Sequence, residues 1–207
     1  MAALLLNFRN TIIVSVILAL IFIVGYGVHG PDHFGMIFWQ AVLRWLHVVS
    51  GILWIGLLYY FNFVQIRKMP DIPAELKPAV SKYIAPEALF WFRYAALATV
   101  IFGLLIAWIR GYIVKVLTLG LAGGFDASQG GDVKYSLLGA GMWLALIMAF
   151  NVWFFIWPNQ KIALGLVEAD ADAKAKAGKT ATLFSRTNTL LSLPMLVTMT
   201  MSQTTFG

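Results

Sequence analysis

The sequence predicts an all-α integral membrane protein, and its composition and hydropathy are the observations that predict it. Hydrophobic residues make up 60% of the 207 residues and charged residues only 12%, whereas a soluble domain carries about 25% charged residues. The mean hydropathy is +0.81. The apolar segments lack the alternation of barrel strands, and in hydrocarbon only helices or closed barrels satisfy all their backbone hydrogen bonds. We therefore expect residues 1–207 to form a single membrane domain made of helices.

Five segments are long enough to cross a bilayer, which needs about 20 apolar residues per helix. The first segment has no charged residue and is interpreted as a retained span rather than a cleaved signal peptide. The five predicted transmembrane helices cover residues 11–28, 37–62, 88–109, 135–157 and 184–203.

The segment between the fourth and fifth spans predicts a water-exposed helix. Residues 161–177 are rich in alanine, and two aspartates each precede a lysine by four residues, a spacing that supports a helix. Gly178 follows directly and is a typical residue for capping a helix C-terminus. We therefore expect a cytoplasmic helix over residues 161–177. By contrast, residues 111–131 contain six glycines, and we expect a loop there.

The lysines and arginines outside the spans, or within two residues of a span's end, predict the orientation of the chain. Ten lie on the side of the N-terminus and three on the opposite side, and cytoplasmic loops carry the excess of basic residues. The ten are Arg9, Arg67, Lys68, Lys77, Lys82, Lys161, Lys174, Lys176, Lys179 and Arg186, and the three are Arg110, Lys115 and Lys134. We expect a cytoplasmic N-terminus, a periplasmic C-terminus and a location in the bacterial inner membrane. The net charge of +6 is then an orientation signal, and no nucleic-acid partner is predicted.

One face of the second span carries the residues that suggest chemistry. Arg44, His47, Gly51 and Trp54 are separated by three, four and three residues, which places them along one side of a helix. In one interpretation they bind a b-type haem: His47 ligates the haem iron, Arg44 pairs with a propionate, and Gly51 lets the flat group approach the backbone. In the other, His47 forms a hydrogen bond across the bundle and Arg44 extends to the membrane surface. The spacing leaves both open.

The remaining polar residues of the spans are expected to hold helices together. We expect Asn151, Asn188, Ser192 and Thr198 to form interhelical hydrogen bonds, and Arg93 to extend toward the membrane surface. Gly141, with two alanines at four-residue spacing, predicts a close helix contact. The sequence shows no phosphate-binding loop, paired carboxylates or hydrolase triad, so no catalytic residue is assigned.

Three stretches of the sequence resemble a known family. They are RWLHVVSGILWIG at residues 44–56, NVWFFIWPNQ at 151–160, and residues 188–194 followed by 199–203. Together they resemble the urate oxidase N-terminal family, the membrane half of bacterial urate-oxidising proteins linked to a cytochrome c. The resemblance extends over about residues 40 to 205. It implies a membrane domain that works in urate oxidation, with electrons leaving through the fused cytochrome c.

The sequence departs from the family pattern at several positions. It has no cysteine and therefore no pair for covalent haem attachment. Thr187 and Gln203 stand where family histidines would be expected, and Ala95 stands in place of an acidic residue. We therefore expect a subunit that binds haem b and passes electrons to a separate cytochrome c or respiratory complex. The alternative is a non-catalytic accessory or assembly subunit of a larger membrane complex. Lipids and other membrane subunits are the expected partners, and a homo-oligomer is left open.

Overall fold

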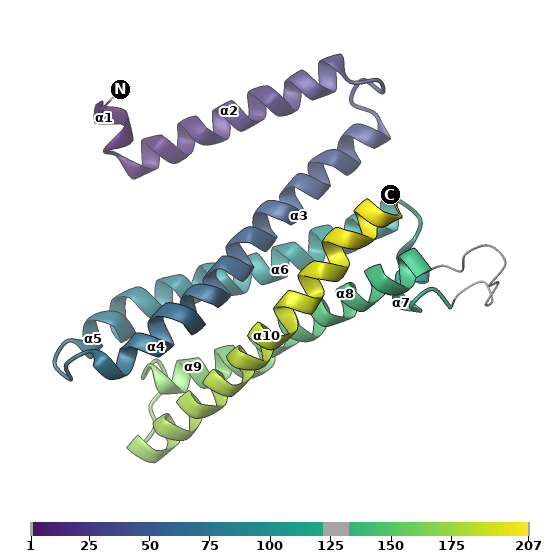
Figure 1. The fold of residues 1–207 in the computed structure, drawn as a ribbon. Coiled ribbons are helices and arrows are strands. Elements are labelled where there is room, and N and C mark those ends of the chain that lie inside the picture. The colour runs from purple at the N-terminus through teal and green to yellow at the C-terminus, as the bar shows by residue number, and fades with distance from the viewer. Residues whose placement is uncertain (1, 122–132, 207) are drawn as a thin grey trace. The chain divides into compact units, whose positions relative to one another are not determined.

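The computed structural model describes residues 2–121 and 133–206, and within these ranges every regular element is a helix (Figure 1). The loop expected over residues 111–131 is only partly described: residues 113–117 form the short helix α7 (Ile113–Leu117) instead, and residues 122–131 lie outside the described residues. The chain divides into two compact units, Met1–Trp45 and Leu46–Gly207. Helix α3 (Met36–Tyr59) contributes to both units.

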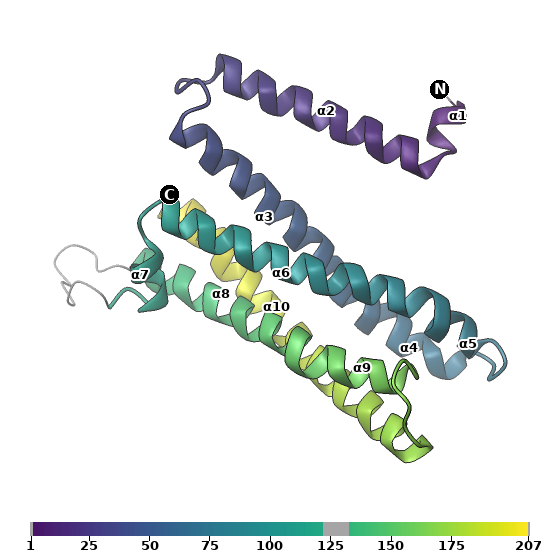
Figure 2. The ribbon, with the colours of Figure 1, turned by 180° about the vertical axis from the view of Figure 1, so that it is seen from behind.

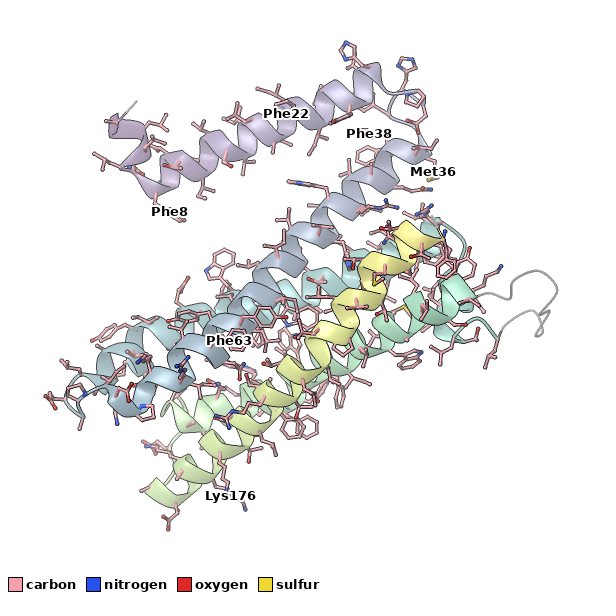
Figure 3. The ribbon with its side chains drawn as sticks, viewed as in Figure 1. Phe8, Phe22, Met36, Phe38, Phe63 and Lys176 are labelled. Carbon is pink, nitrogen blue, oxygen red and sulfur yellow. The ribbon has the colours of Figure 1, made fainter. Side chains whose placement is uncertain are left out.

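The first unit contains α1 (Ala2–Leu5), α2 (Phe8–His29) and the beginning of α3. Asn7 caps α2, because its side chain accepts a hydrogen bond from the backbone N–H of Asn10. The carboxylate of Asp32 accepts bonds from the first backbone N–H groups of α3, at Ile37 (2.6 Å) and Phe38 (3.1 Å). Phe22 projects from α2 as an exposed side chain (Figure 3). The turn between the helices is thus fixed by local capping.

The second unit begins with the remainder of α3 and continues through short helical segments. These are the π-helix η1 (Tyr60–Gln65), α4 (Ile66–Lys68), the 3₁₀ turn η2 (Met69–Asp71), α5 (Lys77–Ala79) and the π-helix η3 (Val80–Ile84). The later elements are α6 (Ala85–Ile109), α7 (Ile113–Leu117), α8 (Val133–Phe150), the π-helix η5 (Asn151–Ile156), α9 (Trp157–Ala163) and α10 (Ala171–Thr205).

The long helices of the second unit lie side by side as a bundle. In Figures 1 and 2, α4, α5 and α9 gather at one end of this unit, and α7 lies with the chain's C-terminus at the other. One apolar core joins α3, α6, α8 with η5, and α10, since each contributes side chains that are almost fully buried. Its members are Trp54, Ile55, Leu58, Phe61, Leu89, Phe92, Ala95, Ala96, Met148, Val152, Ile156 and Met195.

Four helical stretches of the described residues are long and apolar enough to cross a membrane. They are Phe8–His29, Met36–Asp71, Lys77–Ile109 and Val133–Ala163. They correspond to the first four predicted spans, and the chain has the helices of a multi-pass membrane protein. The fifth predicted span, residues 184–203, lies inside the 35-residue helix α10, whose many polar residues keep it outside this group. A fifth crossing and the orientation of the chain stay predictions.

The region expected to form a helix over residues 161–177 is built differently. Helix α9 ends at Ala163, and Gly165 follows with a left-handed φ of +74°, a conformation that glycine adopts easily at helix ends. Asp170 then caps α10 by accepting a hydrogen bond from the N–H of Ala173 (2.7 Å). Helix α10 continues through Gly178 without a break. The capping side chain of Asp170 therefore determines where the helix begins, and Gly178 is an interior residue.

Candidate functional site

His47 lies on α3 and forms a hydrogen bond to α6. Its ring nitrogen Nδ1 is 2.8 Å from the backbone carbonyl oxygen of Thr99. A carbonyl oxygen can only accept a hydrogen bond, so Nδ1 carries the hydrogen and donates it. The Thr99 hydroxyl donates in turn to the carbonyl of Ala95 (2.7 Å), which anchors that side chain on its own helix. The bond leaves the second ring nitrogen of His47, Nε2, available.

Small residues on both helices make room for this contact. A Cβ atom at Gly103 of α6 would lie 2.9 Å from Cε1 of the His47 ring. A Cβ atom at Gly51 would lie 3.8 Å from the Thr99 methyl group, which is ordinary van der Waals contact. Trp54 is 1% exposed and belongs to the shared core. The structure thus places His47, Gly51 and Trp54 along the contact between α3 and α6, and the His47–Thr99 bond is the hydrogen bond across the bundle that the second interpretation expects.

The fit of these residues to a haem group rests on His47. Nε2 makes no hydrogen bond within residues 2–121 and 133–206, and a histidine whose Nδ1–H is bound by a carbonyl is the usual arrangement of a metal-ligating imidazole. Gly51 faces the methyl group of Thr99, and Trp54 is buried in the apolar core, so other side chains of the protein cover both residues. Arg44 belongs to the first unit, where its side chain is exposed. The part of the chain that the structure describes has no group of three or more His, Asp and Glu side chains that could hold a metal ion.

Three hydrogen-bonded pairs of polar residues connect one face of α10 to other helices. Asn62 donates to the Ser185 hydroxyl (2.8 Å), Asn151 donates to the Asn188 side-chain oxygen (2.8 Å), and the hydroxyls of Tyr59 and Ser192 are 3.0 Å apart. The α10 members are spaced three and four residues apart, so they share one face of the helix. We call these six residues the α10 seam. Two of the three partners lie on the π-helical segments η1 and η5, a helix type that is often found at functional sites.

The Asn151–Asn188 pair is the most enclosed part of the seam. Asn188 is 0% exposed, and its amide nitrogen also donates to the carbonyl of Met148 on α8 (2.9 Å). The interhelical hydrogen bonds expected for Asn151, Asn188 and Ser192 are therefore confirmed. The expectation for Thr198 was wrong, because its hydroxyl donates to carbonyls of its own helix, at Pro194 and Met195. Gly141 does lie at a close helix contact, since a Cβ atom there would be 2.3 Å from the Thr198 hydroxyl oxygen.

Arg93 is the interior charge that the sequence reasoning placed incorrectly. It is 8% exposed rather than extended to the surface, and its Cζ atom lies 3.4 Å from the ring centroid of Trp157 on α9. Such stacking of a guanidinium on an indole is a cation–π contact. One of its nitrogens, Nη1, is buried without a hydrogen-bond partner. The sequence places an aromatic and a basic residue, Trp157 and Lys161, one helical turn apart. This spacing could not show that Trp157 packs against Arg93 of α6.

The comparison with known protein families finds one match, and it covers the C-terminal helices from α7 to α10. Residues 112–206 match the urate oxidase N-terminal family. The match confirms the resemblance for the stretches at 151–160 and 188–203, and it contains Asn151, Asn188 and Trp157, whereas the stretch at 44–56 lies outside it. His47 and Arg93 precede the matched region. No curated protein and no solved structure matches the chain.

Proposed function

We propose that this protein is an electron-transfer subunit of the bacterial inner membrane that binds a b-type haem through His47. Two findings support a membrane subunit of this family: the urate oxidase N-terminal match and the four helices suited to cross a bilayer. The observation that carries the haem assignment is the 2.8 Å bond from Nδ1 to the Thr99 carbonyl, because it directs the free nitrogen of the ring away from α6's backbone acceptor.

The residues around His47 would each have a definite role in such a site. His47 would be the ligand, and the Thr99 carbonyl would fix its ring orientation and increase its basicity. The apolar core between the same helices, which includes Trp54, would keep water away. Bound there, the haem would supply reversible one-electron chemistry, and its potential would depend on the ligand and on burial. Electrons would pass to a separate cytochrome c or respiratory complex, because the chain contains no cysteine for covalent haem attachment.

An absorption spectrum of the purified protein, with and without dithionite, tests this function. We expect a Soret band in the wild type that shifts on reduction and is lost in His47→Ala. The matched controls are His29→Ala and His33→Ala, which remove the other two histidines of the chain, both exposed in the first unit, and should keep the band. A wild type without a Soret band or extractable protohaem would contradict the proposal, as would an unchanged spectrum in His47→Ala.

The second candidate function is a non-catalytic accessory or assembly subunit of a larger membrane complex. The observation that favours it is the α10 seam, in which neutral amides and hydroxyls bond to one another and so serve to hold helices together. Gentle detergent extraction followed by size-exclusion chromatography tests it. Co-elution with a defined set of membrane proteins is expected under this function. A monodisperse, partner-free protein with redox turnover of its own would rule it out.

A further inference from the structure

The indole of Trp157 has two cationic side chains beside it. The guanidinium carbon of Arg93 lies 3.4 Å from the centroid of its ring, and the ammonium nitrogen of Lys161 lies 5.7 Å from it. Arg93 comes from α6 and Lys161 from α9, so the fold brings together two charges that are far apart in the sequence. Two like charges beside one ring repel each other, and the aromatic ring offsets only part of that cost.

Neither cation has an acidic partner within residues 2–121 and 133–206. The one ion pair in these ranges joins Lys68 and Asp71. The acidic residue of α6, Glu87, accepts a hydrogen bond from the indole of Trp91 one turn later (2.9 Å). A buried charge without a compensating anion is costly in a protein interior and more so in a membrane. Arg93 is 8% exposed, so this cost applies to it.

Two hydrogen-bond donors in this region also lack acceptors. Nη1 of Arg93 and Nε1 of Trp153 are both buried without a partner. They are close to the same side chain, because the Arg93 guanidinium carbon lies 5.9 Å from the Tyr94 ring centroid and the Trp153 ring centroid lies 5.8 Å from it. Buried polar groups are normally hydrogen-bonded, so an unused donor on an uncompensated arginine and a second unused donor beside the same tyrosine indicate a missing acceptor that is negatively charged.

We propose that Arg93, Lys161 and Trp153 bind a phosphate-type oxyanion beside the indole of Trp157. An arginine offers a planar set of donors that matches phosphate oxygens, a lysine adds a mobile point charge, and an indole N–H adds a directed donor. The anion neutralises the two cations and accepts from both unused donors. Its source is either the headgroup of an anionic lipid or a free phosphate compound. The site is independent of the haem assignment, since it shares no residue with His47 and its neighbours.

The test uses the full chain in nanodiscs and two probes that separate the sources. In the first arm, inorganic phosphate is titrated against protein in phosphatidylcholine nanodiscs, and binding is followed by tryptophan fluorescence. In the second arm, nanodiscs contain increasing phosphatidylglycerol, and lipids retained by the protein are counted by native mass spectrometry. We expect saturable binding of one phosphate group in at least one arm. Binding of phosphate alone identifies a soluble anion, and retention of phosphatidylglycerol alone identifies a lipid headgroup.

Four variants and one control connect this binding to the named residues. Loss of a charged hydrogen bond in Arg93→Gln should weaken binding by at least about tenfold. Arg93→Lys keeps the charge but not the planar donors, and Lys161→Gln and Trp153→Phe each remove one contact while keeping Arg93. All three should weaken binding by a smaller factor, and they test the site if Arg93→Gln fails to fold. Arg110→Gln, at the other end of α6 beside Tyr112, should bind like the wild type. Absence of binding in both arms, or equal binding by the wild type and the Arg93 and Lys161 variants, would overturn the proposal.

Discussion

The hydrogen bond from His47 to Thr99 explains how a histidine is accommodated between two helices of an apolar bundle. The acceptor is the backbone carbonyl of Thr99 on α6. Its oxygen has a second lone pair that can accept a hydrogen bond from a side chain. Gly103 leaves the space that the ring occupies. The site therefore depends on the absence of a side chain on α6 as much as on the histidine itself.

We predict that Gly103→Ala displaces the His47 ring. The new methyl group would lie 2.9 Å from Cε1, so the ring must move and its bond to Thr99 is weakened or lost. We expect a loss of about 1 kcal/mol in the free energy of unfolding, measured in mixed micelles. Gly56→Ala is the matched control, because a Cβ atom there meets no other group within 4 Å. Equal stabilities of the two variants would show that the ring moves without cost.

The Asn151–Asn188 pair gives a second prediction for single residues. Asn151→Leu removes the donor to Asn188, and Asn188→Leu also leaves the carbonyl of Met148 without its donor. Each change should cost about 1–3 kcal/mol, since it leaves a buried polar group unpaired. In a double-mutant cycle the coupling should be favourable and about 0.6 kcal/mol, the average for such bonds in membranes. Strict additivity of the two changes would contradict a direct interaction.

At the scale of helices, α10 is held by specific polar contacts as well as by apolar packing. Ser185, Asn188 and Ser192 face three different partners. The same polar residues lower the hydropathy of this helix, so hydropathy alone separates it from the four apolar stretches. The pairing itself could not be predicted, because a sequence shows that the serines and asparagines are there but not that they are bonded across the bundle.

The first four spans could be predicted because their cause is local. Each is an apolar run with few charges, and no knowledge of neighbouring helices is needed to recognise it. The environment of Arg93 could not be predicted in this way, because the side chain that covers it comes from α9, more than sixty residues later. The His47 contact lies between these cases. Its position on the helix face was evident from the spacing, whereas its partner Thr99 was not.

The short helix α7 gives a prediction at this scale. A Cβ atom at Gly139 of α8 would lie 2.3 Å from the backbone oxygen of Val116 on α7, and a backbone atom cannot move aside cheaply. Gly139→Ala should therefore shift α7 and cost about 1–3 kcal/mol. Faster hydrogen exchange at residues 113–117 is the expected measurement. Gly178→Ala is the control, since its nearest neighbour would be 3.7 Å away. Unchanged exchange in Gly139→Ala would contradict this docking.

For the whole molecule, the proposed orientation places the start of α10 in the cytoplasm and the end of α6 in the periplasm. The chain has no cysteine, so single cysteines can report on each side without background. Lys176 projects as an exposed side chain near the start of α10 (Figure 3), and Arg110 is exposed at the end of α6. Both positions are therefore accessible to a reagent on their own side of the membrane.

We predict that an impermeant maleimide labels Arg110→Cys in intact spheroplasts, whereas Lys176→Cys reacts only after permeabilisation. The reason is the distribution of ten basic residues against three across the predicted loops. Labelling of both positions from the outside would show that they share one side of the membrane. The reverse pattern would show that the chain is inverted.

The π-helical segments η1 and η5 also determine where the length of this chain can vary. A π-type turn closes hydrogen bonds five residues apart rather than four, so it accommodates one residue more than the α-helix around it. Deleting one residue within 60–65 or 151–156 lets that turn become α-helical while both flanking helices keep their faces. A deletion elsewhere in α3 or α8 turns everything beyond it by about 100°. In an alignment of related sequences, single-residue gaps inside the membrane helices should therefore fall at η1, at η5 and at the third π-helical segment, η3.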